Sequence, residues 1–85
     1  MKNKANDKIL LAMHTVVHII RDIITFDTKG TLDHDKMKIM ALLWEENHKY
    51  KETGDPNVLE TYKIYFKQFK EILTNAMEEI NKYEN

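Results

Sequence analysis

The sequence predicts an all-α protein, an antiparallel up-down-up bundle of three helices spanning residues 6–26, 33–52 and 56–83. Apolar residues recur at alternating spacings of three and four, which is the period of a helix with one buried face. The chain holds only one proline and two glycines, and all three fall in two short polar segments between the predicted helices. Such short connections place consecutive helices antiparallel to one another.

The composition limits the classes of function. At 85 residues the chain is a single helical domain, residues 1–85, with a small core. Its 13 basic and 14 acidic residues give a net charge of −1. A dedicated nucleic-acid-binding protein usually carries a basic excess, so we expect no nucleic-acid partner. The absence of cysteine excludes disulfides and thiolate zinc sites, and it fits a reducing, cytoplasmic location.

We also expect no membrane partner. The apolar stretch near the N-terminus is interrupted by His14, His18, Arg21 and Asp22, so no uninterrupted apolar run approaches the ~20 residues of a membrane span. No small-residue cleavage site follows this stretch, and we therefore expect no signal peptide.

The first predicted helix is unusually apolar. Asn6 or Asp7 can cap its free N–H groups. Its apolar arc covers about 200° of the circumference, wider than a helix that is buried on one side only. We therefore expect residues 6–26 to be covered from two directions, by both other helices or by a second copy of the chain. The seam of this helix consists of Leu10, Met13, Val17, Ile20 and Ile24.

The second predicted helix follows a turn at Gly30, with Thr31 or Asp33 as its cap. One face is apolar, and the opposite face is charged. Glu45 and Glu46 are interpreted as parts of a solvated, salt-bridged face rather than as an acid–base pair, since adjacent helical residues point in different directions. The apolar face consists of Met37, Met40, Leu43, Trp44 and Tyr50.

The clearest boundary is Thr53-Gly54-Asp55-Pro56, where Gly54 fits a helix end, Asp55 an N-cap and Pro56 the first helical position. The helix that follows is the longest, and we expect it to extend past the other two by a turn or more. That overhang is too apolar to remain in water without a partner. Its seam consists of Leu59, Tyr62, Phe66, Phe69, Leu73, Ala76, Ile80 and Tyr83, with Phe66 expected in the core.

These features favour a small non-catalytic protein that binds and modulates a larger protein partner and that dimerises. The Lys-, Asn- and Ile-rich composition is typical of AT-rich genomes, which suggests a bacterial or phage accessory protein. No catalytic motif, cofactor site or phosphate loop occurs in the sequence. We predict two interaction surfaces: a patch formed by Leu11, His14 and His18, and the overhang bearing Met77, Ile80 and Tyr83.

Two alternatives concern the histidines. His14, His18 and Asp22 follow one another at intervals of four, so they share one helical face and can form a metal site. Thr15 stands where the zincin motif has glutamate, so a solvated polar face stays the main interpretation. A single exposed histidine on a helix also resembles the phosphoacceptor of two-component relay domains, but Ile19 replaces the acidic residue that follows it in sensor kinases, and their downstream proline is absent.

The third alternative is a helical DNA-binding regulator. Lys63, Lys67 and Lys70 form a basic stripe that phosphates can meet, but no other basic cluster joins it. Such lysines more often keep a bundle in solution and cover apolar edges with their stems. Glu78, Glu79 and Glu84 give the C-terminal end of the same helix the opposite sign, so two copies can pair head-to-tail or antiparallel.

Overall fold

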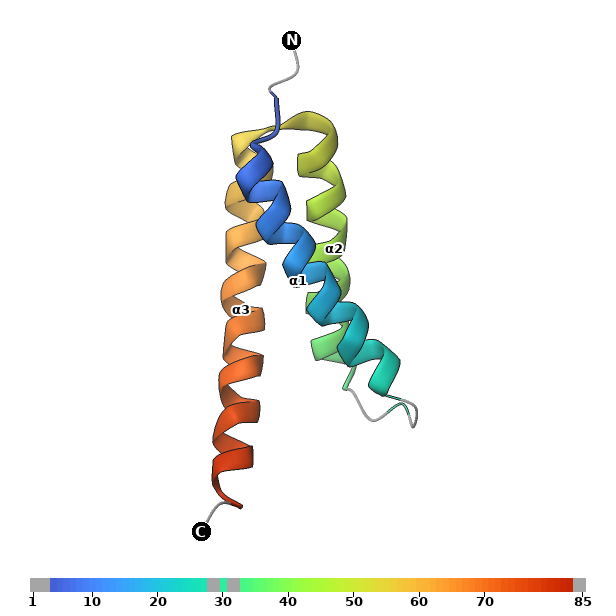
Figure 1. Cartoon of the computed structure of the whole chain (residues 1–85), viewed down its shortest axis with the longest axis vertical. Coiled ribbons are helices and arrows are strands. Elements are labelled where there is room, and N and C mark those ends of the chain that lie inside the picture. The colour runs from blue at the N-terminus through green and yellow to red at the C-terminus, as the bar shows by residue number, and fades with distance from the viewer. Residues whose placement is uncertain (1–3, 28–29, 31–32, 84–85) are drawn as a thin grey trace.

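The computed structural model describes residues 4–27, 30 and 33–83. These residues form three helices and no strand: α1 (Asp7–Phe26), α2 (His34–Thr53) and α3 (Pro56–Asn81) (Figure 1). The all-α class is confirmed, and each predicted helix boundary lies within two residues of the observed one.

Side-chain caps start all three helices where the sequence placed them. The carboxamide oxygen of Asn6 accepts from the N–H groups of Lys8 and Ile9 at 2.9 and 3.3 Å. Asp33 caps α2; Thr31, the alternative, lies outside the described residues. Asp55 caps α3, with Pro56 next to it at the start of the helix. These caps satisfy N–H groups that the helices themselves leave free.

The turn between α2 and α3 depends on Gly54. Its backbone is left-handed, with φ of 61°, and its N–H donates to the carbonyl of Tyr50 at 2.7 Å. Residues with a Cβ adopt this conformation only at a cost, so glycine ends α2 here. The turn sends α3 back along α2, and the two helices lie side by side as an antiparallel hairpin (Figure 1).

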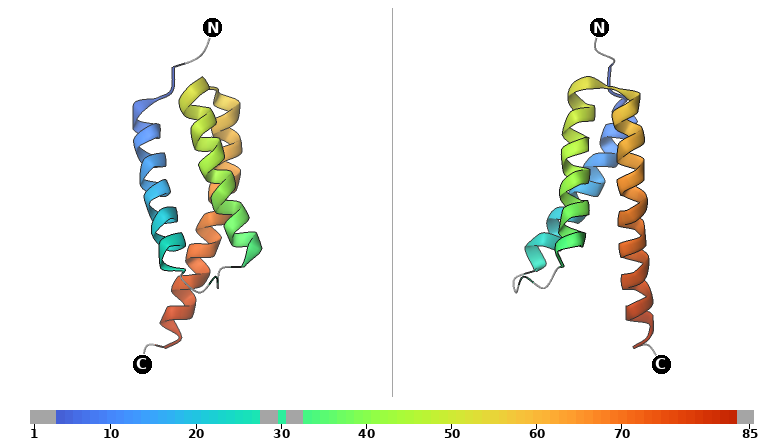
Figure 2. Two further views of the ribbon diagram at one scale, coloured as in Figure 1. Left: turned by 90° about the vertical axis from the view of Figure 1, so that its right-hand side faces the viewer. Right: turned by 180° about the vertical axis from the view of Figure 1, so that it is seen from behind.

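The third helix of the predicted bundle is set at an angle. α1 crosses the hairpin obliquely (Figures 1 and 2). It approaches α2, whereas the Cα atoms of α1 and α3 stay more than 8 Å apart. α3 continues beyond both other helices, which gives the chain an elongated shape of 55 × 25 × 19 Å.

The core draws on all three helices, but unequally. α1 contributes only two fully buried side chains, in spite of its wide apolar arc. Phe66, expected in the core, is only half-buried; the neighbouring Phe69 is the buried phenylalanine of α3. The buried apolar residues are Met13, Ile20, Met40, Leu43, Tyr50, Tyr62 and Phe69.

α3 covers only part of α1. Ala12, Ile19 and Ile24 are exposed, and Phe26 is 84% exposed. A closed three-helix arrangement therefore stays a prediction, and α1 retains apolar surface for another molecule to cover.

Candidate functional site

A groove of about 360 Å³ separates α1 from α3. The Cα atoms of the two helices stay more than 8 Å apart, and the walls of the groove are almost entirely apolar. Lys8 and Lys63 are the charged residues at the groove, one on each helix. The apolar walls are Ile9, Ala12, Met13 and Val16 from α1 and Leu59, Tyr62 and Phe66 from α3. An apolar groove between two helices has the shape that an additional amphipathic helix fills.

One polar atom is buried beside this groove without a partner. Tyr62 is 6% exposed, and its hydroxyl has no hydrogen-bond partner among the described residues. Burial raises the pKa of Tyr62 to about 12. Its ring stacks on that of Phe66, with centroids 6.2 Å apart. An unsatisfied buried hydroxyl costs about 1–3 kcal/mol, so this position weakens the isolated chain.

The overhang of α3 continues the apolar wall of the groove. Leu59, Phe66, Leu73 and Ile80 are seven residues apart, so they lie along one side of α3. We call these four residues, with Met77 between them, the α3 face. Its first half lines the groove, whereas Met77 and Ile80 are exposed beyond the end of the groove, as predicted for the overhang, and so is Tyr83.

The two histidines of α1 contact each other. The Nε2 atoms of His14 and His18 are 3.0 Å apart, and the rings meet edge to face with centroids 4.4 Å apart. Both side chains are exposed, as is Leu11 one turn before. Asp22 does not join them, since no group of three potential metal ligands occurs in the part of the chain that the structure describes.

His48 of α2 lies near the first histidine but has a partner of its own. It lines a second hollow, of about 300 Å³, together with His14, Trp44 and Lys51. The indole N–H of Trp44 donates to Nε2 of His48 at 3.0 Å. That nitrogen is therefore occupied by a neighbour on the same helix.

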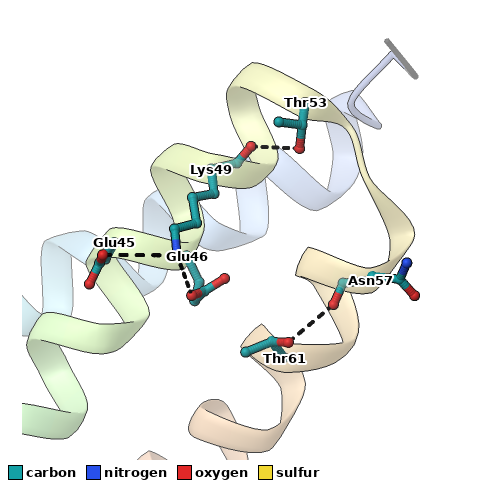
Figure 3. Close-up of polar contacts among 6 residues, drawn as sticks. All are labelled: Glu45, Glu46, Lys49, Thr53, Asn57 and Thr61. Atoms are coloured by element: carbon teal, nitrogen blue, oxygen red, sulfur yellow. Dashed lines mark hydrogen bonds and ion pairs between the residues drawn. The ribbon is translucent and has the colours of Figure 1, made fainter. Parts of the chain in front are cut away.

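Glu46 is not part of a solvated face, and the prediction for this residue was wrong. It is 7% exposed and points toward α3, whereas Glu45 is exposed (Figure 3). Its carboxylate accepts from Nζ of Lys49 at 3.2 Å, and this hydrogen bond raises the pKa of Lys49. The signal was present in the sequence: Glu46 stands three residues after Leu43 and four before Tyr50, which is a core position of α2.

No protein-family model matches this chain, and no curated protein or solved structure shows significant similarity to it.

α1 meets the length and composition criteria for a helix that can cross a membrane. Core helices and N-terminal signal sequences pass the same test. Arg21 and Asp22 are costly inside a bilayer, and the structure buries Met13 and Ile20 of this helix inside the chain.

Proposed function

We propose that this chain is a non-catalytic helical interaction protein that forms a homodimer in the cytoplasm and, as a dimer, binds and modulates a larger protein. The observation that supports the dimer best is the α3 face. Half of it lines an unfilled groove, and the other half projects into solvent on the overhang. The two halves complement each other, because the overhang of one copy can fill the groove of another.

One register brings the two halves of the α3 face together. In an antiparallel pair of α3 helices, a two-fold axis between Lys70 and Glu71 brings Lys63 of one copy close to Met77 of the second copy. Lys63 and Met77 lie on the same flank of α3, whereas Glu71 and Glu78 lie on the far side with Ile64. Residues 59–66, the groove wall, then face residues 75–82 of the second copy, which is the overhang.

The same pairing completes the predicted bundle. Each overhang inserted beside α1 acts as a fourth helix next to the α2–α3 hairpin, so α1 gains the second cover that its apolar arc requires. The up-down-up arrangement is then closed by two chains together. The opposite side of α1, with Leu11, stays free for the larger partner.

Sedimentation equilibrium tests the dimer. At tens of micromolar we expect a dimer for the natural chain and a monomer for Ile80→Glu, with helical content unchanged. Ile64→Glu is the matched control, since Ile64 is 60% exposed and Ile80 is 63% exposed, but Ile64 lies off the α3 face. A monomeric natural chain, or equal disruption by both variants, contradicts the proposed dimer.

The larger partner is tested with a variant that leaves the dimer intact. We expect Leu11→Glu to lose a host protein that the natural chain retains on an affinity column, and Ile64→Glu to keep it. Salt-dependent binding to random duplex DNA instead favours the DNA-binding alternative. Co-sedimentation with neutral lipid vesicles favours insertion of α1 into a membrane. Either result contradicts the proposed function.

A further inference from the structure

We propose that His14 and His18 of one chain chelate a single divalent transition-metal ion of the zinc, nickel or copper class through their two Nε2 atoms. The inference is independent of the proposed dimer. It is based on the exposed pair of imidazoles whose Nε2 atoms converge to 3.0 Å on the outer side of α1.

The separation of the nitrogens fits two ligands of one ion. With metal–nitrogen bonds of ~2.0–2.1 Å, two ligands are about 2.9 Å apart at a right angle and about 3.4 Å apart at a tetrahedral angle. The observed 3.0 Å lies between these values. Both rings directed at one ion at a right angle have centroids about 4.5 Å apart, and the observed centroids are 4.4 Å apart.

The surroundings define the site as a two-residue chelate. In the metal-free pair of neutral rings, one ring carries its proton on Nε2 and donates it to Nε2 of the other. When the ion binds, that proton moves to Nδ1 of its own ring through solvent, so that both Nε2 lone pairs face the ion and each ring carries one proton on Nδ1. Trp44 occupies Nε2 of His48, so that residue does not supply a third ligand. Both rings of the pair are exposed, so water or another donor completes the coordination. Imidazole ligands select zinc, nickel or copper over magnesium or calcium.

The chelate also has a structural consequence. It connects two consecutive turns of α1, which is rich in β-branched residues that are weak helix formers and which buries only two side chains. An ion that binds the folded helix and not the unfolded chain stabilises the fold by mass action. Zinc should therefore raise the melting temperature of the natural chain.

Calorimetric titration of the full, tag-free chain with zinc chloride, repeated with nickel chloride, tests the site. We expect one ion per chain, with affinity reduced roughly tenfold or more by either His14→Gln or His18→Gln. The control variants His34→Gln and His48→Gln should bind as the natural chain does and keep the zinc-dependent rise in melting temperature.

Nuclear magnetic resonance of the natural chain gives a second readout that needs no variant. Zinc should shift the ring protons of His14 and His18 and leave those of His34 unchanged. Three results would overturn the site. They are an equal loss of zinc affinity in the control variants, zinc binding by the natural chain no tighter than that by His14→Gln, and zinc-dependent shifts of the ring protons of all histidines. A stoichiometry of one ion per two chains would contradict a chelate within one chain, because it would show a site shared between two copies.

Discussion

Removing one oxygen atom from each of two buried tyrosines should change stability in opposite directions. Tyr50 is 4% exposed, and its hydroxyl accepts the N–H of Asn6 at 3.1 Å, which ties the start of α1 to the end of α2. Tyr62 is almost equally buried, and its hydroxyl has no partner among the described residues. The chain thus contains its own matched pair.

The expected magnitudes follow from these contacts. Tyr50→Phe removes a hydrogen bond and should lower the free energy of unfolding by about 1 kcal/mol. Tyr62→Phe removes an unsatisfied group and should raise it by about 1 kcal/mol, the lower end of the usual range because a small void remains. In a domain of this size each kcal/mol shifts the melting temperature by about 4–8 °C.

Alkaline pH should enlarge the effect at Tyr62. The pKa of Tyr62 is raised from 10.0 to about 12 by burial. Ionisation of Tyr62 therefore leaves the free energy of unfolding unchanged below pH 10. Between pH 10 and 12 the free energy of unfolding falls, since the unfolded chain releases the proton first. Two pKa units correspond to roughly 3 kcal/mol. Tyr62→Phe has no hydroxyl to ionise at this position. The difference in the free energy of unfolding between this variant and the natural chain should therefore grow between pH 10 and 12.

Urea denaturation followed by circular dichroism measures both effects. The denaturation series is measured at neutral and at alkaline pH. A low micromolar protein concentration keeps any dimer dissociated in both. The other tyrosines and the lysines titrate in both proteins, so their effects largely cancel in the difference. If Tyr62→Phe destabilises the chain as much as Tyr50→Phe does, the hydroxyl of Tyr62 has a partner in solution and the reasoning fails.

Three further tests of the packing use single substitutions. Phe69→Ala should cost about 3–5 kcal/mol and Phe66→Ala about half as much, as urea midpoints will show; equal costs would place both rings in the core. Gly54→Ala should cost about 1–2 kcal/mol, because its left-handed backbone penalises a Cβ, and an unchanged melting temperature would contradict this conformation. Glu46→Ala should lower the melting temperature more than Glu45→Ala, and the reverse order would show that Glu46 is solvated.

The helix boundaries could be predicted from the sequence because they depend on local chemistry. Asp55 and Pro56 act within one turn of where they stand, and Gly54 acts through its own backbone. Neither effect requires knowledge of the rest of the fold. The exposure of Ile80 was predictable for a related reason: the apolar period continues in α3 after the other helices have ended.

The features that sequence reasoning missed depend on contacts distant along the chain. The separation of α1 from α3, between which the groove lies, and the half-burial of Phe66 follow from how the three helices pack against each other. The different environments of Tyr50 and Tyr62 also follow from tertiary contacts, since one hydroxyl meets Asn6 and the other meets no polar atom. Glu46 was missed because its charge was given more weight than its position.

The candidate histidine site was also predictable from the sequence only in part. The interval of four between His14 and His18 predicts that they share a face, and the structure brings their Nε2 atoms together. The same spacing suggested Asp22 as a third ligand, but the structure does not bring it to the pair. Equal spacing along a helix places side chains on one face; which of them meet depends on side-chain length and rotamer.

Disulfide trapping between chains tests the proposed dimer most directly, because the natural chain has no cysteine. In the double variant Lys63→Cys/Met77→Cys, the two cysteines of one chain are too far apart along α3 to bond to each other, at ~1.5 Å per residue. Mild oxidation should therefore give a covalent dimer from the double variant and none from either single variant. A monomeric double variant, or dimers from the single variants, would contradict the antiparallel pairing.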